Sequence, residues 1–130
     1  MTFYYLDTSV AIHALLRTPG ALEWFDAVSA DPESTIISSR ILQTELTRYL
    51  RRESAEVAAR SQILDHVSAI PLSEAILTSA ESIAEHVRAI DAIHLASAMV
   101  GGSRTVVVTH DARMRTVAEA NGLTVLDPVA

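Results

Sequence analysis

The segment Phe3-Tyr4-Tyr5-Leu6-Asp7-Thr8-Ser9 decides how the rest of the chain is interpreted. Its apolar, aromatic start is typical of a short buried strand, and the acid Asp7 follows that strand directly. Apolar residues at helical spacing come next, namely Val10, Ala11, Ile12, Leu15 and Leu16. An acid between a strand and a helix lies at the carboxyl edge of a parallel sheet, where open α/β sheets bind their ligands.

Length and composition predict a single domain that spans residues 1–130. The absence of cysteine excludes disulfides and thiolate metal sites, and it fits a reducing cytoplasm. No apolar run approaches the ~20 residues that span a bilayer. Asp7 interrupts the first apolar stretch and no basic region precedes it, which argues against a signal peptide.

The formal charge is −6, and all ten cations are arginine. Arginine pairs well with phosphate or carboxylate, although genomic composition explains the absence of lysine equally well. A negative net charge argues against a nucleic-acid partner. That objection weakens if some of the acids hold cations.

Predicted strands and helices alternate along the chain. Besides residues 3–6, strands are expected at 35–38, 66–70, 105–109 and 123–126, and helices at 9–16, 21–29, 39–52, 55–65, 73–86, 91–100 and 111–120. This alternation predicts an α/β fold with a parallel sheet and right-handed crossovers. One point stays open: either the helix from Ser73 crosses the sheet, or residues 87–90 return the chain to the carboxyl edge.

Three acids, Asp7, Asp91 and Asp111, stand where helices are expected to begin. Each could be an ordinary N-cap, worth ~1 kcal/mol. A helix that follows a parallel strand begins at the carboxyl edge of the sheet, so Asp7 and Asp111 are expected at that edge. A helix that leads back into a strand also begins there, so Asp91 is expected at the same edge. We therefore expect these acids to converge.

Glu45 lies among the apolar positions of its helix, one turn from both Ile41 and Tyr49. A carboxylate on an apolar face is costly unless it is paired or metal-bound. It stands ~9 Å from the helix start at ~1.5 Å per residue, still near the sheet edge. The alternative is an ion pair with a buried arginine such as Arg88.

Four neighbouring carboxylates must protonate or hold cations, because each pair at ~4 Å repels by about 4 kcal/mol at an effective dielectric of 20. Oxygen ligands without cysteine favour Mg²⁺ or Mn²⁺ over zinc. Magnesium takes one or two carboxylates, several waters and a substrate phosphate. The pattern therefore indicates hydrolysis of a phosphodiester at a metal site.

Other polar residues near these acids have two interpretations each. His94 is interpreted as a hydrogen-bonded core histidine rather than a metal ligand. Thr8, Ser9 and Thr109 either orient an acid or belong to turns. The run Arg48, Arg51, Arg52 indicates either phosphate contacts or a solvated helix end.

Four segments occur in an order that resembles the PIN-domain ribonucleases, specifically the VapC toxins of bacterial toxin–antitoxin modules. They are Leu6-Asp7-Thr8-Ser9, Leu42-Gln43-Thr44-Glu45-Leu46, Asp91-Ala92-Ile93-His94-Leu95-Ala96 and Thr109-His110-Asp111. The resemblance implies a three-layer α/β/α fold with a five-stranded parallel sheet and Mg²⁺- or Mn²⁺-dependent cleavage of RNA, often tRNA or ribosomal RNA. It also implies a homodimer and inhibition by a cognate VapB-type antitoxin.

By position, the resemblance makes Asp7, Glu45, Asp91 and Asp111 the metal-binding and catalytic acids. Some members carry another acid or Asn just after the fourth acid, whereas Ala112, Arg113 and Met114 follow here. A second metal would then be held weakly or arrive with substrate.

Rival classes fit less well. A phosphoacceptor receiver domain needs a lysine, which this chain lacks, and a haloacid-dehalogenase phosphatase needs an aspartate where Ser9 stands. A PIN-like DNA nuclease and a catalytically silent PIN-like binding domain remain open.

Overall fold

The computed structural model describes all residues, 1–130. Five parallel strands form one sheet in the order β3-β2-β1-β4-β5. They are β1 (Thr2–Leu6), β2 (Ser34–Ser39), β3 (Ser68–Ile70), β4 (Thr105–Val108) and β5 (Thr124–Leu126). The chain builds outward from β1 first on one side and then on the other. The strand order therefore reverses at β1, and such a switch point is where open sheets form their ligand crevice.

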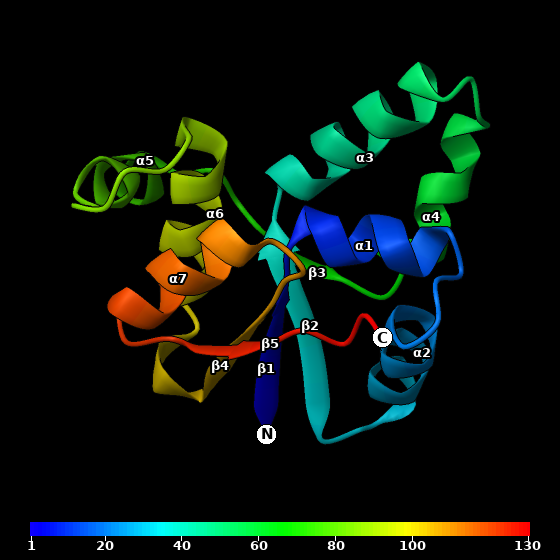
Figure 1. Cartoon of the computed structure of the whole chain (residues 1–130), viewed down its shortest axis with the longest axis horizontal. Helices are drawn as coiled ribbons and strands as arrows, with labels where there is room; N and C mark the ends of the chain where they lie inside the picture. The colour runs from blue at the N-terminus through cyan, green and yellow to red at the C-terminus, as the bar shows by residue number, and fades with distance from the viewer.

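Helices cover both faces of the sheet, as Figure 1 shows. They are α1 (Thr8–Leu15), α2 (Ala21–Ala30), α3 (Ile41–Arg52), α4 (Ser61–Leu64), α5 (Glu74–Glu81), α6 (Ala89–Met99) and α7 (Ala112–Ala120), with short 3-10 turns η1 (Val57–Arg60) and η2 (Gly102–Arg104). The prediction of a three-layer α/β/α fold with a five-stranded parallel sheet is confirmed.

The alternation of side chains along the strands creates the two outer layers. Leu6 and Val108 pack with α1, α2, α3 and α4 on one face. The preceding residues, Tyr5 and Val107, pack with α6 on the other. Because the central strands are buried on both faces, their apolar residues run without interruption, as the sequence of β4 predicted.

Two predicted helices are wrong in extent. In place of a helix over 55–65 the chain forms η1 and the single turn α4. Ser54 adopts a left-handed conformation (φ 55°) after α3, and of residues 55–65 only Ile63 is buried. Apart from Ile63 and the partly buried Leu64, a longer helix would have few residues packed against the core.

The helix expected over 73–86 ends at Glu81, and residues 82–88 return the chain to the carboxyl edge. Ile83 and Val87 of this return pack against the core between α6 and α7, which explains their helix-like apolarity. Helix α6 then begins at Ala89, two residues before the predicted start, so Asp91 lies inside its first turn rather than at the N-cap.

Local contacts fix the start of α5 and the end of α7. The hydroxyl of Ser73 accepts the backbone N–H of Ile76 at the start of α5 (3.2 Å). At the end of α7, Gly122 adopts φ 80° and the N–H of Leu123 reaches the carbonyl of Ala118 at 3.0 Å, which closes the helix. None of the helices combines the length and apolarity needed to cross a bilayer.

Candidate active site

Asp7 lies at the end of the central strand and is held by two hydroxyls. Leu6 of β1 is in register with Val108 of β4, so Asp7 and Thr109 follow neighbouring strands. Thr109 Oγ1 donates to Asp7 Oδ2 at 2.8 Å, and Ser9 Oγ donates to the same oxygen at 2.7 Å. Asp7 occupies the N-cap position of α1, yet its side chain makes no capping bond. The two hydroxyls therefore orient an acid, and the N-cap interpretation does not hold for Asp7.

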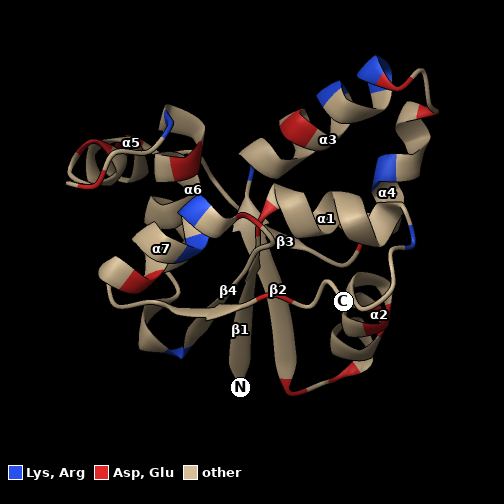
Figure 2. Ribbon diagram, in the orientation of Figure 1, with Lys and Arg blue, Asp and Glu red and all other residues tan.

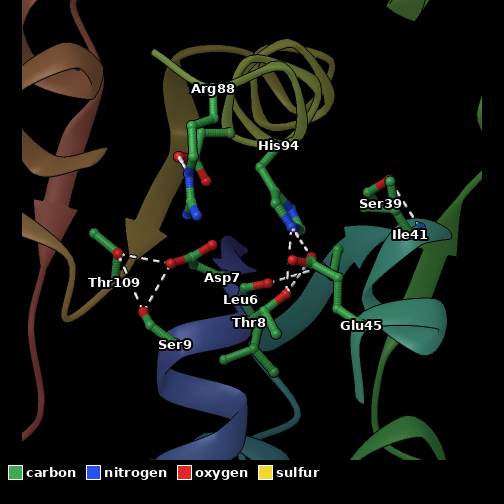
Figure 3. Close-up of polar contacts among 12 residues, drawn as sticks. Leu6, Asp7, Thr8, Ser9, Ser39, Ile41, Glu45, Arg88, His94 and Thr109 are labelled. Atoms are coloured by element: carbon green, nitrogen blue, oxygen red, sulfur yellow. Dashed lines mark hydrogen bonds and ion pairs between the residues drawn. The ribbon is translucent and has the colours of Figure 1, made fainter. Parts of the chain in front are cut away.

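Glu45 reaches the same edge from α3. Its Oε1 accepts hydrogen bonds from Thr8 Oγ1 and His94 Nε2, both at 2.6 Å, as Figure 3 shows. The alternative of an ion pair with Arg88 is not found, because Arg88 pairs with Asp91 and its side chain is 80% exposed. Thr8 thus also orients an acid rather than serving only the turn.

His94 is a core histidine, as predicted from its apolar neighbours, with 1% of its surface exposed. Its Nδ1 lies 2.7 Å from the hydroxyl of Tyr5, which also accepts the N–H of Ser39 at 3.1 Å. The contact with Glu45 was missed in the sequence. The signal was there, since Glu45 and His94 are the polar residues on two otherwise apolar helix faces.

Asp91 and Asp111 line one hollow of about 320 Å³ together with Arg88 and Arg113. Arg88 Nε donates to Asp91 Oδ2 at 3.1 Å. Asp111 Oδ1 accepts the backbone N–H groups of Arg113 and Met114 at 2.8 and 3.1 Å, so Asp111 is a true N-cap of α7. The capping interpretation is therefore right for this acid alone.

The pKa shifts show that these acids share one electrostatic environment. Burial lowers the pKa of His94, but the hydrogen bond to Glu45 and the negative charges of Asp7 and Asp91 offset that effect and raise it. The hydrogen bond and charge of Asp91 raise the pKa of Arg88, and the charges of Asp111 and Glu45 add to this. The charges of Asp7, Glu45 and Asp91 thus act on His94, and those of Asp91, Asp111 and Glu45 act on Arg88.

The pKa of Glu45 moves the opposite way. Burial raises it, yet the hydrogen bonds from His94 and Thr8 and the positive charge of Arg88 bring it below its ordinary value. A lowered pKa on Glu45 and a raised one on His94 describe the same ion pair from its two sides. Glu45 is therefore ionised at neutral pH, as a metal ligand must be.

The family model described as PIN domain matches residues 4–120. The chain belongs to the PIN-domain family. Ribonuclease VapC35 of Mycobacterium tuberculosis is 30% identical over 132 residues, covering 95% of this chain and 96% of the relative.

Structures named VapBC are among the solved structures similar to this PIN-domain chain. VapBC-1 from nontypeable Haemophilus influenzae has a TM-score of 0.74 at 17% identity and covers 99% of this chain and 100% of its own. VapBC2 from Rickettsia felis, bound to a DNA fragment from the promoter, has a TM-score of 0.73 at 15% identity, covering 97% and 98%. At these identities the likeness shows the fold.

No three acidic or histidine side chains of this PIN-domain chain are arranged to hold a metal ion as they stand. The cause is visible in the contacts, because Asp91 turns to Arg88 and Asp111 caps α7. Each of the four acids nevertheless uses a single oxygen for its protein hydrogen bonds and leaves the other without a protein donor. Since Mg²⁺ takes only one or two carboxylates plus waters and phosphate, this donor set fits it.

Proposed function

We propose that this PIN-domain chain is an endoribonuclease that depends on Mg²⁺ or Mn²⁺ and acts as the toxin of a type II toxin–antitoxin system. The observation that carries the proposal is the state of Asp7. It is 5% exposed at the switch point of the sheet, fixed through one oxygen by Ser9 and Thr109, with the other oxygen free. A buried carboxylate held this way is preorganised to bind a cation. The relative named a ribonuclease supports RNA as substrate.

In this proposal Asp7, Glu45, Asp91 and Asp111 hold the metal. The bound metal supplies an activated water and stabilises the leaving oxygen during in-line hydrolysis. The protein's own part is to position the acids: Ser9 and Thr109 fix Asp7, and Thr8 fixes Glu45.

Arg88 is the cation best placed to meet substrate. Its guanidinium pairs with Asp91, and its side chain is 80% exposed. A phosphate that enters the site offers it a second anionic partner, and a guanidinium fork suits phosphate oxygens. Arg88 would then orient the phosphate, and Asp91 would be available to hold the metal.

We further propose that a VapB-type antitoxin inhibits this chain and that the chain forms a homodimer. The named complexes among similar structures support a protein partner. Expression of this chain alone is expected to arrest bacterial growth, and co-expression of the partner to restore it. If a soluble, folded chain is expressed without harm, the toxin role is contradicted. The nuclease activity is tested separately by the cleavage experiment below.

The cleavage test uses RNA and DNA of matched sequence with Mg²⁺, Mn²⁺ or chelator. Asp7→Asn is compared with Asp26→Asn, which removes the same charge from an exposed position on α2. We expect metal-dependent cleavage of RNA that Asp7→Asn abolishes and Asp26→Asn retains. Equal cleavage by Asp7→Asn would remove the enzyme claim, and faster cleavage of DNA would assign a DNA nuclease instead.

A further inference from the structure

A cavity of about 670 Å³ runs along α3 from the acidic site, starting at Thr8 and Glu45. Arg48, Tyr49 and Arg52 line it, at positions three, four and seven residues after Glu45. That spacing places them on one face of the helix. At ~1.5 Å per residue, Arg52 lies about 10 Å from Glu45 along the helix axis. Figure 2 shows this change along α3 from acidic to basic residues.

Three arginines of this cavity have no acidic partner. They are Arg48, Arg51 and Arg52. Both guanidinium–carboxylate pairs of the molecule lie elsewhere, one at the start of α6 and one on α7. In a chain of net charge −6, three unpaired guanidinium groups at one cavity make a local site for anions. Arginine forks match the oxygens of phosphate.

The cavity also has an apolar and aromatic part. Ile12, Ile41 and Ile90 contribute apolar surface. The guanidinium of Arg52 lies 5.4 Å from the ring centroid of Tyr49. Aromatic rings and guanidinium planes are the groups on which unpaired bases of single-stranded RNA stack. A cavity of this volume falls in the range of about 300–1,000 Å³ that suits small ligands.

We propose that this cavity, the α3 cavity, binds an unpaired nucleotide of the RNA next to the scissile phosphate. Tyr49 stacks on its base, and the three arginines pair with the flanking phosphates. The proposal rests on the proposed function and adds a nucleotide subsite to it. An unpaired base is favoured there, because a paired base would first have to be unstacked and unpaired to enter the cavity.

An acidic peptide would also be attracted by the arginines. The cavity, however, also has the acidic residue Glu45 in its lining, which does not suit an acidic peptide. A phosphodiester chain suits both ends, since its phosphates pair with arginine here and with metal at the acids. The stacking surface of Tyr49 and Arg52 favours a base as well.

The test measures binding of a fluorescent single-stranded RNA in chelator, so that no cleavage occurs, over a range of salt concentrations. Arg48→Gln and Arg52→Gln are compared with Arg104→Gln. Arg104 is exposed and directly precedes β4, so it lies at the amino ends of the strands, opposite the end that carries the acids. For single strands each lost phosphate contact lowers the slope of log K against log salt by about 0.7. We expect that change for Arg48→Gln and Arg52→Gln only.

Stacking is tested separately at Tyr49. Tyr49→Ala is expected to weaken binding about fivefold to 150-fold with an unchanged salt slope. Tyr49→Phe keeps the ring and should bind like the wild type, which separates loss of stacking from loss of folding. A duplex of the same sequence should compete poorly with the single strand.

Equal behaviour of Arg48→Gln, Arg52→Gln and Arg104→Gln would overturn the proposal, as would absence of RNA binding by the wild type. Stronger competition by an acidic peptide than by RNA would assign the cavity to a protein partner and also overturn it. The proposed subsite and the proposed function can be contradicted separately. If the cavity variants cleave and bind RNA normally, only the role of the α3 cavity is contradicted. If the cavity variants lose binding but the wild type never cleaves RNA, the cavity is supported and the nuclease function is contradicted.

Discussion

The hydroxyl of Thr109 donates to Asp7 Oδ2 at 2.8 Å, and the oxygen of this hydroxyl accepts the backbone N–H of Asp111 at 3.1 Å. One hydroxyl therefore couples two acids that stand 104 positions apart (111 − 7). The coupling follows from the sheet, because β1 and β4 are neighbours and Leu6 lies opposite Val108. Thr109 is 1% exposed, so water does not replace it easily.

Replacing Thr109 by valine should lower cleavage while the fold is kept. The change conserves shape and removes the hydroxyl that orients Asp7. Loss of a group that orients a metal ligand typically lowers activity about 10- to 100-fold, and we expect that range here. Thr109→Ser should restore activity. The control is Thr116→Val on the exposed side of α7, where the hydroxyl bonds the carbonyl of Ala112. Wild-type rates in both valine variants would contradict this role of Thr109.

Tyr5→Phe should destabilise the protein. It leaves His94 Nδ1 and the N–H of Ser39 without their shared partner in the core. An unsatisfied buried group costs about 1–3 kcal/mol, and the free energy of unfolding in urea should fall by an amount in that range. Tyr4→Phe is the matched control, because no hydrogen bond of its hydroxyl is present. Equal stability of the two variants would contradict the importance of this contact.

The stability of the metal-free protein should fall as pH rises from 6.5 through the raised pKa of His94. The folded protein raises the pKa of His94 above the ordinary 6.5, so charged His94 stabilises the fold below that value. That contribution is lost as pH rises through the raised pKa. NMR titration of the His94 ring in chelator should give a midpoint above 6.5, and a midpoint below it would contradict the ion pair with Glu45.

Gly20→Ala should destabilise the protein more than Gly122→Ala. Both glycines have positive φ, 88° and 80°, where a side chain adds strain of about 1–2 kcal/mol. A Cβ at Gly20 would in addition come within 2.1 Å of the carbonyl oxygen of Pro128, whereas at Gly122 it meets open space. The difference between the two unfolding free energies measures how firmly the C-terminal segment is held. Equal values would show that this segment is not packed there in solution.

Much of the fold follows from the sequence because apolar periodicity and turn residues are local signals. The strand that ends at Asp7 and the continuous strand before Thr109 were predicted from such signals, and the structure places them side by side. The break of the 55–65 helix was not predictable locally, because it depends on which residues find a packing partner. Likewise, Ile83 and Val87 mimic a helix face while serving as core for α6 and α7.

The site was partly predictable for the same reason. Asp7 and Asp111 follow neighbouring strands and are linked through Thr109, and Asp91 lines a hollow together with Asp111. The partners that fix them depend on side-chain rotamers and long-range packing. The contact between Glu45 of α3 and His94 of α6 is an example. Both residues stand out as polar positions on apolar helix faces, but their spacing in the sequence does not show that they meet.

Calorimetric titration of Mn²⁺ into the purified protein tests the central claim most directly, since it asks whether these acids bind a cation without depending on any substrate. The account predicts saturable binding by the wild type and by Asp26→Asn, and at least about tenfold weaker binding by Asp7→Asn. Equal binding by Asp7→Asn, or no binding by the wild type, would contradict it.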